Sequence, residues 1–344
     1  MRRAVLSLFL AAVLPIAATG AASQTKPGMA PIDVHVEPIA SFGRVSPETQ
    51  FGEFEFRGGL VLSSPMKGFG GLSGFDVRPN GTDFVAVSDR GKWFSGRLVR
   101  NAGRLTGIEA TRWGPMRDIR GRPLTRRVRS DAESVRLASS GNGAYVTFEQ
   151  SNDLKFYAFT RDPALARAEI VAVPRAARGL VANQGLETVA VAPLGGPLAG
   201  SPVLVTERSL DADGNHRAFI VSGKQAGAFS IVRSDDYDVT DGAFMPNGDL
   251  LLLERKVSAL PIGVNMRLRR IAGDAIRPGA VLDGPVALEA AMSEQIDNME
   301  GLAVSTDPDG KTRVTIVSDD NLNPLQRTLL LEFVWTGPAV AVAE

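Results

Sequence analysis

The chain has 344 residues, of which 44% are hydrophobic and 22% charged, a balance typical of a folded globular protein. Its 38 basic residues equal its 38 acidic ones, so the overall charge gives no reason to expect nucleic acid as a partner. Cysteine is absent, which excludes disulfides, thiolate metal sites and cysteine nucleophiles.

Residues 1–23 have the features of an export signal. Arg2 and Arg3 precede an apolar run from Ala4 to Ala18, and small residues follow it. This run is too short to span a bilayer comfortably, and no later segment is continuously apolar, so we expect no integral membrane association. We predict cleavage between residues 19 and 24 and a periplasmic or secreted bacterial protein.

Residues 24–50 form a proline-punctuated, extended segment, and residues 51–337 are predicted to form one domain. The domain begins with a strand over residues 51–62, in which hydrophobic residues alternate. This strand has no hairpin partner nearby. We therefore expect it to pair with a closing strand over residues 329–335 and to complete a ring.

One hairpin pattern occurs five times between these strands: a strand that opens on a polar residue, a turn, and a strand that closes on a carboxylate. The hairpins cover residues 73–89, 133–149, 187–207, 241–254 and 300–319. Shorter apolar runs follow each hairpin and bring the count to about four strands per repeat.

This repeat predicts an all-β fold, a β-propeller with five recognisable blades. Six blades would require more than one closing strand from residues 31–62. We expect residues 280–282 to be an outer strand of the fourth blade and residues 286–295 to be a short surface helix.

The polar ends of the hairpins should meet at one rim, because the start of one strand lies beside the end of its antiparallel partner. The first column of residues comprises Ser73, Glu133, Glu187, Asp241 and Glu300, and the second comprises Asp89, Glu149, Glu207, Glu254 and Asp319. Nine of these ten residues are acidic. So many adjacent carboxylates cannot all stay ionised without a cation or arginine partners among them.

All nine carboxylates are therefore candidate metal ligands. Carboxylate oxygens favour Ca²⁺ over Mg²⁺ or Mn²⁺ in a ring of flexible geometry, and we expect no organic cofactor. We assign the first column mainly to cation binding. The second column suits structural ion pairs, since Arg90, Arg208 and Arg255 each follow one of its acids. A solvated acidic funnel or a purely structural ion is the alternative.

Motifs around these acids resemble a known family. They are Gly71-Leu72-Ser73-Gly74, Asp131-Ala132-Glu133, Asn183-Gln184-Gly185-Leu186-Glu187, Leu252-Leu253-Glu254-Arg255, Asn298-Met299-Glu300-Gly301 and Ser318-Asp319-Asp320-Asn321. In this order, over residues 70–335, they look like the phytase-like, "esterase-like activity of phytase" family. The resemblance implies an exported propeller related to the calcium-dependent phytases, which hydrolyse phosphate monoesters. Ser73 and Asp241 depart from the glutamate expected at their places.

Metal-assisted hydrolysis of a phosphate or related small-molecule ester is the function we expect. The candidate catalytic carboxylates, which would orient or deprotonate water, are Glu133, Glu187 and Glu300. The candidate substrate-binding residues are Arg90, Arg129, Arg208, Arg255 and Asn321. A non-catalytic, calcium-stabilised binding propeller and a lactonase-like hydrolase are the alternatives. We expect a monomer.

Other motifs are weaker. Seven arginines between residues 112 and 129 could grip an anion or lie on a solvated loop. A serine triad would have to use His216 with Ser73, whose surroundings lack the final glycine of a nucleophile elbow. Asp211, Asp213 and Asn215 alternate like the start of a calcium loop, but Gly214 is out of place and a polar turn is favoured.

Overall fold

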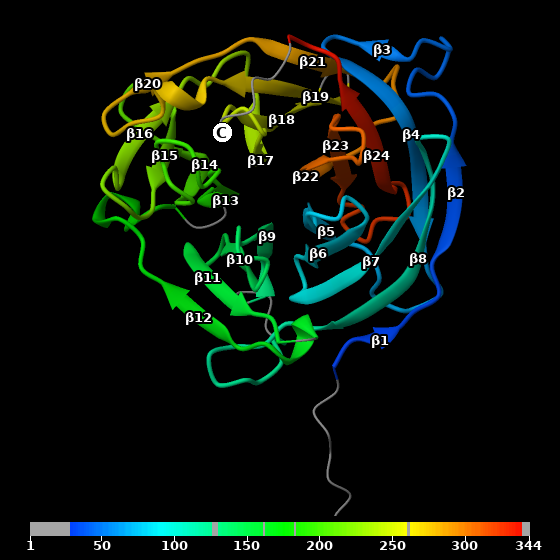
Figure 1. The fold of residues 1–344 in the computed structure, drawn as a ribbon, viewed down its shortest axis with the longest axis horizontal. Coiled ribbons are helices and arrows are strands. Elements are labelled where there is room, and N and C mark those ends of the chain that lie inside the picture. The colour runs from blue at the N-terminus through cyan, green and yellow to red at the C-terminus, as the bar shows by residue number, and fades with distance from the viewer. Residues whose placement is uncertain (1–27, 126–129, 161, 182–183, 260–261, 339–344) are drawn as a thin grey trace, which may run out of the picture.

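The computed structural model describes residues 28–125, 130–160, 162–181, 184–259 and 262–338. These residues form five sheets arranged around a common centre, so the chain makes one circuit of a ring (Figure 1). The predicted all-β propeller with five blades is confirmed. The export signal predicted over residues 1–23 lies outside the described residues.

The blades follow one another in chain order, and each begins with its innermost strand. Blade one contains β5 (Leu72–Val77), β6 (Asp83–Ser88), β7 (Lys92–Asn101), β8 (Arg104–Pro115) and, at its outer edge, β1 (Ala30–Pro31). Blade two contains β9 (Ala132–Leu137), β10 (Gly143–Phe148), β11 (Asp153–Ala158) and β12 (Ala168–Val171). Blade three contains β13 (Leu186–Val191), β14 (Pro202–Leu210), β15 (His216–Ile220), β16 (Gly227–Ile231) and β20 (Val281–Leu282).

The remaining two blades complete the circuit. Blade four contains β17 (Asp238–Phe244), β18 (Leu250–Ala259), β19 (Ile262–Ile271) and β21 (Val286–Ala290). Blade five contains β22 (Met299–Thr306), β23 (Thr312–Ser318), β24 (Thr328–Trp335), β4 (Phe54–Ser63) and β2 (His35–Ile39), with β3 (Gln50–Phe51) paired to β4. Among the described residues, three single-turn 3-10 helices lie in loops: η1 (Pro163–Leu165), η2 (Arg175–Ala177) and η3 (Gly273–Ala275).

The ring closes in the predicted way, because the N-terminal strand β4 pairs with the C-terminal strand β24. Phe56 lies opposite Phe333, and their rings are 5.4 Å apart between centroids. Phe42 packs on both of them. The strands between residues 35 and 62 therefore extend the fifth blade rather than forming a sixth, while Ala30–Pro31 join blade one as β1.

Two local predictions are wrong. Residues 286–290 form the strand β21, which pairs with β19, and not the start of a helix. Residues 281–282 join the third blade, where β20 pairs in parallel with β16. Both segments are short, so the neighbouring edge that they meet in the fold decides their structure more than their local sequence pattern does.

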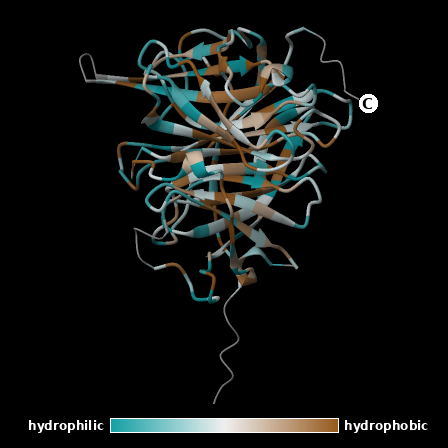
Figure 2. Ribbon diagram, turned by 90° about the vertical axis from the view of Figure 1, so that its left-hand side faces the viewer, coloured by the Kyte–Doolittle hydropathy of each residue, from teal (hydrophilic) through white to brown (hydrophobic). Residues whose placement is uncertain are grey.

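In the described part of the chain, five clusters of buried hydrophobic residues hold the ring together, and each fills the space between two neighbouring blades. Hydrophobic and hydrophilic residues are interleaved along the strands, so both faces of a blade can bury apolar side chains (Figure 2). This face-to-face packing fixes the distance between the innermost strands. The candidate site depends on that distance.

Candidate functional site

A β-bulge interrupts each innermost hairpin near the point where its first strand begins. In blade three, Leu186 pairs with Thr206 and Thr188 with Val205, so that Glu187 lies in the bulge. The same shift places Ser73 in the bulge of blade one and Glu300 in that of blade five. In blade two the register shifts between the pairs Ala132–Phe148 and Val135–Val146, and Glu133 lies between them. Bulges redirect side chains, and these turn the first column toward one end of the ring.

The fourth blade is offset by one residue from the predicted columns. Val239 pairs with Glu254 and Asp241 with Leu253, so Thr240, and not Asp241, lies in the bulge. The second column follows the same offset, which places Arg255 where the other blades carry Asp89, Glu149, Glu207 and Asp319. A one-residue offset reverses the direction of a side chain on a strand. The expected places of Asp241 and Glu254 at the rim are therefore wrong.

Both of these carboxylates are bound by arginines deep in the structure. Asp241 is fully buried, accepts hydrogen bonds from Ser134 Oγ (2.7 Å) and the Leu302 amide (2.8 Å), and pairs with Arg136 at 3.2 Å. Burial raises the pKa of Asp241 to about 7, against the lowering influence of Arg136. Glu254, also fully buried, pairs with Arg267 at 2.5 Å and with Arg269. Neither carboxylate is available as a ligand at the rim.

The other seven predicted acids lie at the rim: Asp89, Glu133, Glu149, Glu187, Glu207, Glu300 and Asp319. A closely spaced group spans blades two and three. Ligand oxygens of Asp131, Glu133 and Glu149 all lie within 4.8 Å of one another, as do those of Glu149, Glu187 and Glu207. Glu149 belongs to both triads. We call these five residues the acidic cluster.

The sequence analysis did not include Asp131 among the ligands. It precedes the inner strand of blade two and lies two residues before Glu133, so both side chains leave an extended backbone on the same side. Spacing of this kind could have suggested it as a ligand. Asp131 was omitted from the two columns because each column was defined by one residue per strand end.

Beside the acidic cluster, the rim contains a positive charge, that of Arg255. Arg255 donates hydrogen bonds to Glu300 and to the Asn298 side chain, and its guanidinium lies 3.7 Å from Glu207. Asn298 also donates to Glu300, at 2.9 Å. The rim therefore has two parts: one where an arginine balances the carboxylates and one where carboxylates face one another.

The electrostatics of the acidic cluster reflect this crowding. Burial, followed by repulsion from neighbouring carboxylates, raises the pKa values of Glu133 and Glu187 well above the ordinary range. The same causes raise the pKa of Glu149 to about 7, and Glu149 shares a hydrogen bond with Glu187, which requires a proton on one of the two. Burial and the Glu300 carboxylate raise the pKa of Asp319 to about 7. The cluster thus favours a bound positive charge, either protons or a metal ion.

The predicted substrate-binding residues are distributed unevenly. Arg255 lies in the rim, as described. Arg208 is half exposed and pairs with Asp238 at 2.6 Å, while Arg90 is more exposed and lies 4.0 Å from Asp89. The Asn321 amide donates to Asp319 Oδ1 at 2.6 Å, which makes Asn321 a support for that carboxylate. Arg129 lies outside the described residues.

Other arginines of the segment before blade two are engaged locally. Arg122 pairs with Asp118 at 2.8 Å, and Arg117 is buried and donates to the Ala164 carbonyl at 2.5 Å. Neither reaches the acidic cluster through these contacts. His216 is buried too, with Nδ1 2.6 Å from the Glu207 carbonyl oxygen, so it supports the backbone beneath Glu207.

The family match decides what the chain is related to. The family described as "Phytase-like: Esterase-like activity of phytase" matches residues 67–322. The chain belongs to this family. The matched region covers the start of blade one to the loop after β23, so it contains all the rim residues of this phytase-like propeller. No curated protein matches the chain significantly.

Solved structures resemble the phytase-like propeller only distantly. The PQQ-bound aldose sugar dehydrogenase of Streptomyces coelicolor is 12% identical, with 88% of this chain and 99% of that one covered and a TM-score of 0.40. The propeller domain of Myceliophteria thermophila Cps50 (Swd1) is 9% identical, with 88% and 100% covered and a TM-score of 0.39. Kuenenia stuttgartiensis hydrazine synthase is 14% identical, with 76% and 60% covered and a TM-score of 0.36.

Proposed function

We propose that this phytase-like propeller is an exported, calcium-dependent hydrolase of phosphate esters. The observation that supports this best is the pair of oxygen triads that share Glu149. Their donor set contains only carboxylate oxygens, which suits a hard divalent cation and gives a softer metal no preferred ligand. The family match supports ester hydrolysis as the reaction class.

The residues that would hold calcium are those of the acidic cluster: Asp131, Glu133, Glu149, Glu187 and Glu207. Once bound, the ion would neutralise these carboxylates and polarise a phosphoryl oxygen of the substrate. Asp241 and Glu254 would take no part in metal binding, because they are buried and Arg136, Arg267 and Arg269 already pair with them.

Arg255 and Arg208 would bind the substrate's remaining anionic oxygens. Arg255 is bound to Glu300 and Asn298, which restricts its guanidinium to the side of the rim opposite blade two. Arg208 is half exposed, and its Nε and Nη2 both contact Asp238 Oδ2. A planar guanidinium can engage two phosphate oxygens at once, so either arginine can orient the ester.

Glu300 is the carboxylate best placed to take a proton from the attacking water. Its Oε1 accepts hydrogen bonds from both Arg255 and Asn298, which leaves Oε2 for the water. Burial raises the pKa of Glu300 and Arg255 opposes that rise. The raised pKa makes the carboxylate a stronger base than an exposed glutamate. Glu133 and Glu187 would act mainly as ligands.

The test is a substrate panel on the purified mature protein, with calcium and after chelation. Phosphate monoesters, phosphate diesters, carboxylic esters and lactones would be compared, and the Glu149→Gln and Glu300→Gln variants measured beside the wild type. We expect calcium-dependent release of phosphate, lost in both variants. The control is Glu169→Gln, since Glu169 is an exposed carboxylate on β12, the outer strand of blade two.

Three outcomes would contradict the proposal in different ways. Turnover that survives chelation would refute the role of the metal. Calcium binding without turnover of any substrate would indicate a non-catalytic binding propeller. Preferred turnover of lactones would favour the lactonase-like alternative.

Export is the remaining part of the proposal. It rests on the basic start and apolar run of residues 1–23, and within the described residues no helix is long and apolar enough to cross a membrane. Mass spectrometry of the protein expressed with its own N-terminus should find a chain that begins between residues 20 and 25, outside the cytoplasm. An uncleaved chain in the cytoplasm would refute this part alone.

A further inference from the structure

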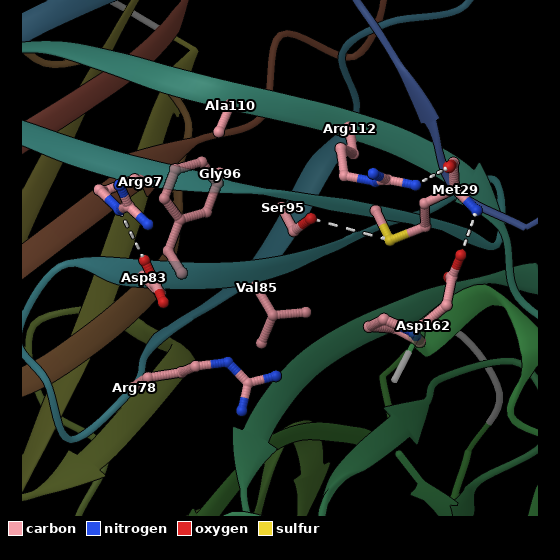
Figure 3. A pocket seen from close by; sticks show the side chains of 12 residues that line it. Met29, Arg78, Asp83, Val85, Ser95, Gly96, Arg97, Ala110, Arg112 and Asp162 are labelled. Atoms are coloured by element: carbon pink, nitrogen blue, oxygen red, sulfur yellow. Dashed lines mark hydrogen bonds and ion pairs between the residues drawn. The ribbon is translucent and has the colours of Figure 1, made fainter. Parts of the chain in front are cut away.

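A second cavity lies away from the rim, between blades one and two. It has a volume of about 430 Å³ and is lined by β6, β7 and β8, by Met29 and by the start of the η1 turn. Figure 3 shows Arg78, Arg112 and Ser95 around it, with Asp83 and Asp162 at its two ends. Nothing in the acidic cluster contributes to this cavity.

The two carboxylates of the cavity are already engaged by the protein. Asp162 accepts the Met29 amide at Oδ2 and the Ala164 amide at Oδ1, both at 2.9 Å. Asp83 accepts Arg97 at 3.1 Å and the Asn80 side chain at 3.0 Å. Arg97 therefore balances the charge of Asp83, and two backbone amides occupy both oxygens of Asp162.

The protein itself uses the hydrogen-bond donors of the cavity, in contrast, only in part. In the part of the chain that the structure describes, the half-buried Arg78 guanidinium makes no hydrogen bond or ion pair, and its Cζ lies 5.9 Å from the centroid of the Phe159 ring. Arg112 donates a hydrogen bond from Nη2 to the Met29 carbonyl at 2.5 Å, and a guanidinium has further N–H donors. The Ser95 hydroxyl has only the Met29 sulfur, at 3.8 Å, which is a weak acceptor.

We propose that this cavity is a binding site for a phosphate group, either inorganic phosphate or a small phosphate monoester. Arg78, Arg112 and the Ser95 hydroxyl line one hollow in which three arginines, counting Arg97, outnumber the two carboxylates Asp83 and Asp162. This combination recognises a small dianion with several acceptor oxygens. The volume is in the range of small-molecule sites, about 300–1,000 Å³, and leaves room for a small organic group on the phosphate.

The site would act independently of hydrolysis at the rim. Phosphate bound here would link the β5–β6 turn and β8 of blade one through Arg78 and Arg112, next to the Asp162 contact that ties Met29 to blade two. Binding should therefore raise the melting temperature, since a ligand that binds only the folded state stabilises it.

Isothermal titration of the full mature protein with inorganic phosphate and with glycerol phosphate, in the presence of chelator, would test the site. Without a divalent ion the acidic cluster repels phosphate, and loss of the binding heat in Arg78→Gln distinguishes this cavity from Arg208 and Arg255 at the rim. We expect Arg78→Gln to weaken binding about tenfold or more, because it removes a charge-assisted contact to the phosphate. Ser95→Ala should weaken it by a smaller factor.

The matched control is Arg277→Gln, since Arg277 is an exposed arginine outside this cavity. It should bind phosphate like the wild type. Equal affinities of wild type and Arg78→Gln, with unchanged melting temperatures before phosphate is added, would overturn the proposal. So would the absence of binding by the wild type at millimolar phosphate. A lack of ester hydrolysis would leave this measurement unaffected, so the two proposals can fail separately.

Discussion

Arg136 on β9 and Asp241 on β17 meet across the centre of the ring, with 3.2 Å between Nη2 and Oδ2, although blade three lies between their blades. Arg136 also pairs with Asp76 of blade one at 3.1 Å and donates to the Val189 carbonyl of blade three at 3.3 Å. The Leu302 amide of blade five donates to Asp241. One buried network thus joins all five innermost strands beneath the rim.

Replacing Arg136 with methionine should destabilise the fold by about 3–5 kcal/mol, since Asp76 and Asp241 would stay buried without their counterion. Chemical denaturation with a fixed calcium concentration would measure this. Arg122→Met is the control: Arg122 pairs with Asp118 at the surface, where such a pair contributes only about 0–1 kcal/mol. A loss for Arg136→Met no larger than that of the control would show that the network does not hold the ring.

Stability without calcium should depend on pH. Burial and neighbouring acids raise the pKa of Glu149 from 4.5 to about 7, so the folded state retains a proton that the unfolded chain releases. A raised pKa stabilises the fold below pH 4.5, and this contribution disappears as pH rises through about 7. In chelator, the melting temperature should therefore fall between pH 5 and 7.5 by this mechanism.

Calcium should oppose that fall, because a bound cation stabilises the ionised carboxylates in place of the proton. Thermal melts would be measured across the same pH range with and without calcium. We expect the two curves of melting temperature against pH to diverge progressively toward alkaline pH. Curves that stay parallel would mean that protons and calcium do not compete for the acidic cluster.

Glu149→Gln should weaken calcium binding more than Glu133→Gln or Glu207→Gln, because only Glu149 contributes to both triads. We expect about a tenfold loss or more, since each 1.4 kcal/mol of lost ligand interaction is tenfold in affinity. Calorimetric titration would measure it. Equal effects of the three variants would show that the triads do not act as a shared site.

Arg255→Gln should shift the acidic limb of the pH–rate profile to higher pH. Arg255 lowers the pKa of Glu300, so its loss lets burial raise that pKa further, and the base becomes ionised only at higher pH. KM for a phosphate ester should also rise about tenfold, which reflects one lost charge-assisted contact. An unchanged profile with a raised KM would leave Arg255 a substrate-binding residue and remove Glu300 as the base.

The sequence determined the repeat and its closure. Five hairpins with acids at corresponding ends predicted the propeller, and the unpartnered strand over residues 51–62 predicted the pairing that joins β4 to β24. These features are readable because hairpin turns and strand alternation are local properties of the chain. The gathering of Glu133, Glu149, Glu187 and Glu207 followed from the same regularity.

The tertiary structure decided what depends on register and on neighbouring blades. A bulge at Thr240 moved Asp241 and Glu254 off the rim and brought Arg255 onto it, and one residue of offset is invisible in a hydrophobic pattern. Likewise, β20 and β21 took their places from the edges they met. Arg136 reaches partners far apart in the chain, and only closure of the ring brings those groups within hydrogen-bonding distance.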